Sequence, residues 1–205
     1  MCDLTLDLPS FLGGAKDVAL AVAAVVTATI AYRGLQQWRE ELRGKADFEV
    51  ARGLLRATFK LRETLKLARS RGMRLTFELG DTLSFQTENE ARAHEYGKRL
   101  RMVGEALQEF DVQAVEAEAL WGHEIAQNAE ALRQCVTTFN VSVDAILDDL
   151  GEGGAHFESN KEWGRQMRAN AHASPDEKNN PLSNAIAAAV GGIEARLRVH
   201  LERPK

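Results

Sequence analysis

The most apolar part of the chain is an uncharged run near the amino terminus, residues 18–32, with the sequence VALAVAAVVTATIAY. Its polar side chains are two threonines and the boundary Tyr32, so a helix here would be apolar on every side. The run spans about 22 Å against a hydrocarbon thickness of about 30 Å. Because the apolar Phe11–Ala15 extends it, we expect a transmembrane helix over residues 11–32. A buried or interfacial helix is the alternative, since six alanines insert less strongly than leucines would.

Charged residues differ on the two sides of this run. A cleaved signal peptide would need a basic region before the apolar core, yet residues 1–17 carry three aspartates and one lysine. The bases that follow the run are Arg33, Arg39, Arg43 and Lys45. Basic residues on the carboxyl side favour an uncleaved anchor with the amino terminus outside and the carboxyl terminus in the cytoplasm.

A stripe of apolar residues at spacings of three and four continues through residues 33–71 and predicts an amphipathic helix. We expect a break in its register near Gly44–Asp47, between two groups of stripe positions. The first group is Leu35, Trp38 and Leu42, and the second is Ala51, Leu54, Thr58, Leu61, Leu65 and Ala68. Residues 72–87 interrupt the helical rhythm and predict a loop, which ends in Thr87 as a helix cap with Glu90 three residues later.

The longest helical pattern covers residues 88–150, where two blocks of apolar residues step by three and four. Unbroken, it would extend about 90 Å and could not bury its stripe within a compact domain. The pattern therefore predicts a long helical hairpin or a break near Gly122, with Gly97 and Gly104 as other places for a bend. We expect residues 33–71 to pack against it in an antiparallel direction.

The remainder of the chain predicts shorter helices. Gly151–His156 indicates a linker, residues 158–171 a short helix, residues 174–181 a polar loop and residues 183–201 a closing helix.

Net charge alternates along the chain, with −2 for residues 1–32, +6 for residues 33–71 and −8 for residues 72–205. A basic stretch next to the span suits an anionic membrane surface. The acidic remainder argues against nucleic acid as a partner. Cys2 and Cys135 would lie on opposite sides of the membrane, so no disulfide framework is implied.

No catalytic, cofactor-binding or metal-binding residue emerges from the sequence. Five histidines occur, but none belongs to an HExxH or ExxH motif, and GEGG at residues 151–154 lacks the lysine of a phosphate-binding loop. The pairs Glu90/His94 and Glu152/His156 share a helix face without a third ligand. Trp121, beside Gly122, is interpreted as a buried packing anchor. These absences argue against an enzyme.

Three strings carry a resemblance: YRGLQQWREELRGKADFEVARGLLRATFKLR at residues 32–62, ALQEFDVQAVEAEALWG at residues 106–122 and AIAAAVGGIEARLRVHL at residues 185–201. With the apolar run before them, they resemble uncharacterised single-pass membrane proteins of proteobacteria. The resemblance covers most of the chain except residues 73–88. It implies a topology and a helical fold, and no functional residue.

The sequence thus predicts an all-α protein with an N-terminal transmembrane helix followed by a long helical hairpin or elongated helical bundle. The expected parts are an extracytoplasmic tail (1–10), the transmembrane helix (11–32), the hairpin (33–150) and C-terminal short helices (151–205). We expect an inner-membrane interaction or scaffold module that contacts lipid through its span and binds a protein partner or itself through helical faces. The alternative is a membrane-bound enzyme or ligand sensor whose site the sequence does not reveal.

Overall fold

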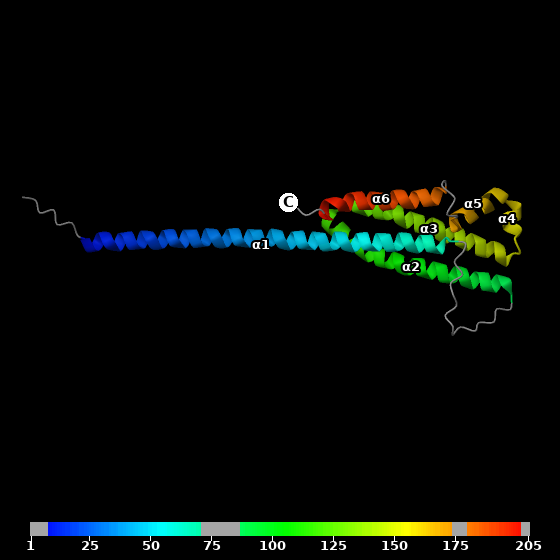
Figure 1. The fold of residues 1–205 in the computed structure, drawn as a ribbon, viewed down its shortest axis with the longest axis horizontal. Helices are drawn as coiled ribbons and strands as arrows, with labels where there is room; N and C mark the ends of the chain where they lie inside the picture. Colours follow the sequence, from blue (N-terminus) through cyan, green and yellow to red (C-terminus); the bar gives the residue numbers. More distant parts are fainter. Residues whose placement is uncertain (1–7, 71–86, 174–179, 202–205) are drawn as a thin grey trace, which may run out of the picture. The chain divides into compact units, whose positions relative to one another are not determined.

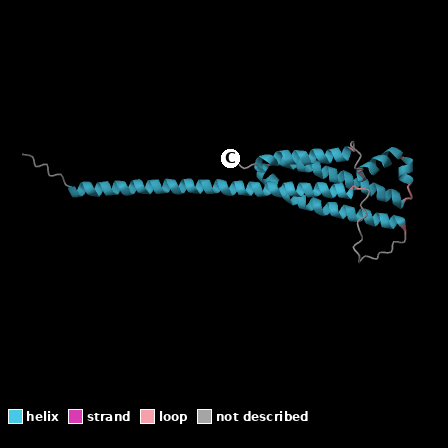
Figure 2. Ribbon diagram, in the orientation of Figure 1, coloured by secondary structure: helices cyan, strands magenta, loops and turns pink. Residues whose placement is uncertain are grey.

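The structure, a computed structural model, describes residues 8–70, 87–173 and 180–201, without the side chains of residues 8–19, 21 and 88. Within these ranges every element is an α-helix, apart from an isolated parallel bridge between Ser70 and Ala173 (Figure 2). The all-α fold class is confirmed. The helices are α1 (Leu8–Ala68), α2 (Glu88–Trp121), α3 (His123–Gly151), α4 (Ala155–Ser159), α5 (Lys161–Ala171) and α6 (Pro181–Leu201) (Figure 1).

Some predicted segments lie partly outside the described residues. The tail expected at residues 1–10 is described only from residue 8, the loop expected at residues 72–87 only at Thr87, and the loop expected at residues 174–181 only from residue 180. At the described end of the first loop, the Thr87 hydroxyl accepts the backbone N–H of Glu90 at 3.2 Å. The predicted cap of α2 is therefore confirmed.

The chain divides into two compact units, residues 1–46 and residues 47–205, and α1 contributes residues to both. The helix is continuous through residues 44–47, so a break in the backbone there is not observed. A glycine inside a helix costs about 1 kcal/mol relative to alanine and does not by itself end it, and no proline follows Pro9 within α1.

Among the described residues, no helix combines the length and the apolarity that a membrane crossing requires. The transmembrane helix expected over residues 11–32 is therefore not found in that part of the chain. The side chains of residues 11–19 and 21, which belong to the expected span, lie outside the described part.

The second unit is a helical bundle in which α2 runs antiparallel to the end of α1. Lys60 of α1 forms an ion pair with Glu109 of α2. Towards the end of α1, Arg99 donates a hydrogen bond to the carbonyl oxygen of Ala68 at 2.9 Å. Residue numbers therefore increase along α1 in the direction in which they decrease along α2. The two helices are antiparallel, as the sequence predicted.

Helices α2 and α3 form an antiparallel hairpin around Gly122. This glycine has φ 77° and ψ −161°, a conformation that is accessible essentially only to glycine, and it interrupts the long helical pattern after Trp121. Asp111 then meets Arg133 at 2.7 Å, and Asn89 reaches the carbonyl of Leu150 at 3.4 Å. The long pattern is thus broken at Gly122, and its two halves turn back on each other as a hairpin. Gly97 and Gly104 lie within α2.

The last helices pack on α3. Helix α6 runs antiparallel to it, since Arg196 forms an ion pair with Glu124 and Gly192 lies against the side chain of Asn128. The expected linker is shorter than residues 151–156, because α3 includes Gly151 and α4 begins at Ala155. The single helix expected at residues 158–171 is two helices, since α5 starts anew at the Asn160 cap, whose side chain accepts the N–H of Trp163.

The core contains the predicted stripes of α1, α2, α3 and α6. On α1 the second group of stripe positions is buried completely or nearly so, with Thr58 bonded to the carbonyl of Leu54 at 2.7 Å. The first group differs, because Leu35, Trp38 and Leu42 are 44–58 % exposed. The predicted register break thus marks the point where the stripe becomes buried. The largest fully buried side chains are Leu54, Leu61, Leu65, Val103, Phe110, Ile125, Leu132, Val136, Phe139, Val143, Ile193 and Leu197.

Candidate functional site

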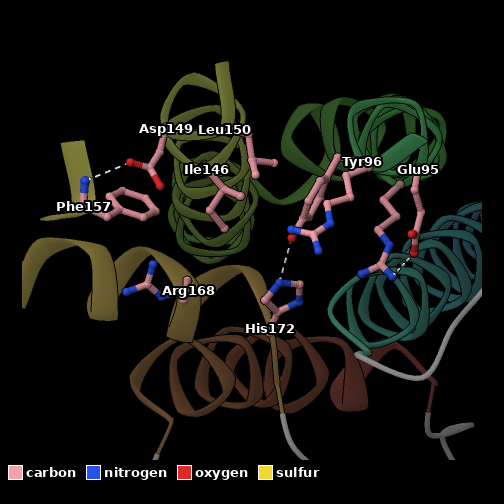
Figure 3. Close-up of a pocket in the computed structure, with 10 residues that line it drawn as sticks. Glu95, Tyr96, Ile146, Asp149, Leu150, Phe157, Arg168 and His172 are labelled. Carbon is pink, nitrogen blue, oxygen red and sulfur yellow. Dashed lines mark hydrogen bonds and ion pairs between the residues drawn. The ribbon is translucent and has the colours of Figure 1, made fainter. Parts of the chain in front are cut away.

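A pocket of about 470 Å³ opens where α2, α3, α4 and α5 meet. Figure 3 shows Phe157 and Arg168 on one side and Tyr96 on the other, with Ile146 above and His172 below. The described residues that line it are Arg92, Glu95, Tyr96, Arg99, Ile146, Asp149, Leu150, Phe157, Arg168 and His172. Guanidinium, carboxylate, phenol and imidazole groups therefore converge beside an apolar wall.

Arg99 anchors one side of the pocket. Its side chain is nearly buried, forms an ion pair with Glu95 one helical turn earlier, and donates to the carbonyl of Ala68 at 2.9 Å. A cation at the C-terminal end of a helix satisfies terminal carbonyls and favours the helix dipole. Arg99 thus caps the C-terminal end of α1 and also holds the Glu95 carboxylate in place.

Tyr96 and His172 connect α2 to the end of α5. The Tyr96 hydroxyl and His172 Nε2 are 2.8 Å apart, with the direction of donation set by the imidazole tautomer. Their rings lie 5.9 Å apart, and the Arg99 guanidinium lies 5.7 Å from the centre of the Tyr96 ring. Both residues of the pair are able to donate or accept, so this part of the pocket can adapt to either kind of polar ligand atom.

The opposite side is built by Asp149, Phe157 and Arg168. The nearly buried Asp149 carboxylate accepts the backbone N–H of Phe157 at 2.9 Å, which fixes the start of α4 against the end of α3. The exposed Arg168 places its guanidinium 4.9 Å from the centre of the Phe157 ring, within the range of a cation–π contact. The positive charge of Arg168 therefore lies beside the aromatic ring of Phe157.

The charged lining residues are the three arginines Arg92, Arg99 and Arg168 and the two carboxylates of Glu95 and Asp149. Of these, Arg99 and Glu95 form an ion pair. No group of three metal-ligating side chains occurs among the described residues. The arrangement offers chemistry for recognition of a charged small molecule.

A second surface consists of the apolar side chains in the first unit. Leu20, Val25 and Ile30 are 59–66 % exposed, although each is strongly hydrophobic. The other exposed large apolar residues of this unit are Val22, Val26, Tyr32, Leu35, Trp38 and Leu42. Large apolar side chains are exposed here in greater number than is usual at the surface of a soluble domain.

The histidines singled out from the sequence are dispersed. His156 pairs with Glu152 at 3.3 Å, as their spacing indicated, and the ring of His200 stacks on Trp121 with centroids 4.2 Å apart. Trp121 is thus a half-buried packing residue. Tyr96, the partner of His172, precedes it by 76 positions, so no local spacing in the sequence joins the two residues. Likewise no local spacing joins Arg92, Asp149 and Arg168, which are on three different helices.

Comparison with known proteins returns no match among family models, curated proteins or solved structures. The resemblance to single-pass proteins of proteobacteria therefore stays a prediction from the sequence.

Proposed function

We propose that this protein is a single-pass, membrane-anchored interaction or scaffold module whose helical bundle lies at the cytoplasmic face of the membrane. The observation that carries the proposal is the exposed apolar surface of the first unit, from Leu20 to Leu42. Removal of such surface from water is worth about 25 cal/mol per Å², so its exposure to water is unfavourable. Insertion of the amino-terminal part into lipid removes this cost.

The length of the anchor comes from the sequence. Residues 18–32 are too few for a full span, and the proposal adds residues 11–17, whose side chains lie outside the described part. Lys16 and Asp17 then fall near one interface, where a lysine can extend its amine towards water. The bases between Arg33 and Lys45 support an orientation with the bundle on the cytoplasmic side.

Carbonate extraction of cell membranes tests the anchor with the full chain. Recovery in the membrane pellet is expected, and release of the intact chain into the supernatant would contradict the proposal. Val25→Asp together with Ile30→Asp should shift the protein to the supernatant, because each charge is costly in hydrocarbon. Val199→Asp, at an exposed position on α6, is the matched control that should leave it in the pellet.

Reporter fusions at Lys205 test the orientation. Activity of a reporter that works only in the cytoplasm is expected, whereas alkaline phosphatase activity at the same position would place the bundle outside.

The interaction role is supported by apolar side chains that the bundle leaves exposed on α2. Val112 and Val115 are more than half exposed beside a shallow hollow that also contains Leu107. Light scattering on the full chain in detergent, compared with Val112→Lys/Val115→Lys, measures self-association through this face. A chain that is monomeric at all concentrations and recovers no partner by cross-linking in cells would argue against the interaction role.

A second candidate function, a membrane-bound ligand sensor, is favoured by one observation. The pocket between α2, α3, α4 and α5 brings histidine, arginine and carboxylate groups together beside apolar residues, as small-molecule sites do.

A further inference from the structure

We infer that α1 pairs in parallel with α1 of a second copy of this chain, through a line of exposed residues in its first unit. The members of this line, which we call the seam, are Ala24, Ala28, Ala31, Leu35, Trp38 and Leu42. The inference deepens the proposed function, a membrane-anchored interaction module, on which it rests for the direction of pairing. It names a second copy as the partner.

The seam follows a seven-residue repeat, because its positions alternate between steps of four and three from residue 24 to residue 42. A strict repeat of this kind keeps one narrow line of a helix, here about 27 Å long, against one neighbouring helix. Contact with lipid requires no such line, since lipid surrounds a helix on all sides. The repeat therefore indicates another helix as the partner.

Side-chain size along the seam changes where the proposed span ends. Within the span the seam contains only alanine, and small residues let two helices approach closely in lipid. The larger apolar residues of the span, all at other positions of the repeat, include Val22, Val25, Val26 and Ile30.

Beyond Tyr32 the seam contains large side chains. Leu35, Trp38 and Leu42 are 44 %, 58 % and 44 % exposed, and burial of such side chains is what drives helix pairing in water. The seam is thus adapted to lipid in one half and to water in the other. Its partner must pass from lipid into water at the same depth, as a second copy of α1 does.

Charges beside the seam permit the pairing of two identical helices. In a parallel pair of this register, Gly34 faces Arg39 of the second copy, and Glu41 faces Ala46 of the second copy. Neither of these pairs brings like charges together. Glu41 is also balanced within its own helix by Lys45, at 2.8 Å. The charged residues at outer positions of the repeat are Arg33, Glu40 and Arg43.

The proposed anchor determines how two copies can meet. Both copies would have the same orientation and the same depth, so they present the seam in parallel and in register. A two-fold axis between the helices then places each seam residue against its counterpart, as in other isologous contacts. Trp38 faces Trp38, and Leu42 faces Leu42. A second copy therefore supplies the matching repeat at the required depth.

Disulfide cross-linking of the full chain in membranes tests this register, in a background of Cys2→Ala and Cys135→Ala. The seam variants are Leu35→Cys, Trp38→Cys and Leu42→Cys, and the matched outer variants are Gln36→Cys, Gln37→Cys and Glu40→Cys. A disulfide requires Cβ atoms about 3.5–4.5 Å apart, a separation that counterparts on the seam approach and outer positions do not. Mild oxidation should therefore yield at least about fivefold more dimer from the seam variants.

Sedimentation of the full chain in detergent measures the strength of pairing. Leu35→Lys/Leu42→Lys and the control Gln36→Lys/Gln37→Lys each add two positive charges, but only the first pair of changes lies on the seam. The seam variant should raise the dissociation constant at least about tenfold, because its charges lose water on pairing, and the control should leave it unchanged. Thermal unfolding and carbonate extraction should show both variants folded and in the membrane pellet.

Three results would overturn the inference: equal dimer yields from seam and outer cysteines, adducts of the seam cysteines with another protein in place of dimers, and an unchanged dissociation constant for Leu35→Lys/Leu42→Lys. Any of these from a chain that stays in the pellet leaves the anchor intact. Release of the chain by carbonate instead contradicts the anchor, and the cross-linking pattern of the released chain still decides whether the seam pairs.

Discussion

Arg69, at the end of α1, donates a hydrogen bond from Nη2 to Asn180 Oδ1 at 2.8 Å, across 111 positions of sequence. Both side chains are 2 % exposed. Arg69 also donates to the carbonyl of Asn170 at 2.8 Å and to the hydroxyl of Ser183 at 3.0 Å. Asn180 in turn accepts the backbone N–H of Ser183, which caps α6 before its first-turn proline. One pair thus joins the ends of α1, α5 and α6.

Replacement of Arg69 by methionine should lower the free energy of unfolding by about 3 kcal/mol or more. The change keeps a long apolar stem but leaves buried acceptors on α5 and α6 without their donor, and each unsatisfied group costs about 1–3 kcal/mol. Urea melts of the full chain in detergent measure it. Arg101→Gln, exposed on α2, should change stability by less than about 0.5 kcal/mol. An equal, small effect of both changes would mean that the Arg69 network does not hold the helices together.

Replacement of a stripe residue by aspartate should lower the stability of the protein more when that residue is more deeply buried. Phe139 is completely buried, so Phe139→Asp should cost about 4 kcal/mol or more, whereas Leu107 is only partly buried and Leu107→Asp should cost less. Glu116→Ala, at an exposed position, should change stability by less than about 0.5 kcal/mol. Denaturant melts rank the three variants, and any other order would contradict the observed packing.

Two glycine-to-alanine changes should have opposite effects on the stability of the protein. A Cβ atom at Gly164 of α5 would lie 2.7 Å from the Phe157 ring, so Gly164→Ala should destabilise the protein by about 1–3 kcal/mol. A Cβ atom at Gly104 of α2 would meet no other part of the protein within 4 Å, so Gly104→Ala should stabilise the protein by about 0.5–1 kcal/mol through helix propensity. Thermal unfolding of both variants decides this. Stabilisation by Gly164→Ala would show that α4 and α5 are farther apart.

The hairpin between α2 and α3 should depend on Gly122. Its φ of 77° with ψ of −161° is a strained conformation for any other residue, so Gly122→Ala should cost about 1–3 kcal/mol, although a Cβ atom there meets nothing. Equilibrium unfolding beside Gly104→Ala, which has ordinary helical geometry, separates backbone strain from the general effect of alanine. A stabilised Gly122→Ala variant would indicate that α2 and α3 can join into one helix.

Burial should make the Cys135 thiol unreactive. It should also make the stability of the protein decrease at alkaline pH. Burial raises the pKa of Cys135 above its ordinary 9.0, while the charge of Arg69 opposes this rise. The thiol therefore ionises first in the unfolded chain, and its contribution to stability is present below pH 9.0 and lost as the pH rises through the pKa of the folded state. Unfolding measured from neutral to alkaline pH should show this loss, and Cys135→Ala should remove it.

Alkylation with iodoacetamide gives an independent readout of the same thiol. Cys135 in the folded chain should react slowly, because it is 5 % exposed and protonated, and it should react at the rate of an ordinary thiol in denaturant. Rapid labelling in native conditions would contradict its burial.

The helical class and most buried helix faces could be predicted from the sequence. This is because the residues on one face of a helix are three and four positions apart in the chain. The stripe from Ala51 to Ala68 is of this kind. The break at Gly122 was predicted from the length of the helical pattern and the position of the glycine. Periodicity did not distinguish Trp38, which is exposed, from Leu54, which is buried, since both occupy stripe positions. Whether a stripe is covered depends on which other helix reaches it.

The pocket depended on tertiary structure alone. Arg92, Asp149 and Arg168 belong to helices whose ends meet only after α2, α3 and α5 have packed. The same holds for Arg69 and Asn180, whose contact joins segments more than one hundred positions apart. A sequence pattern reports on neighbours within a few turns of helix. Convergence of distant polar side chains is set by how the helices pack, which is why the local pattern predicted the bundle and left its candidate site unseen.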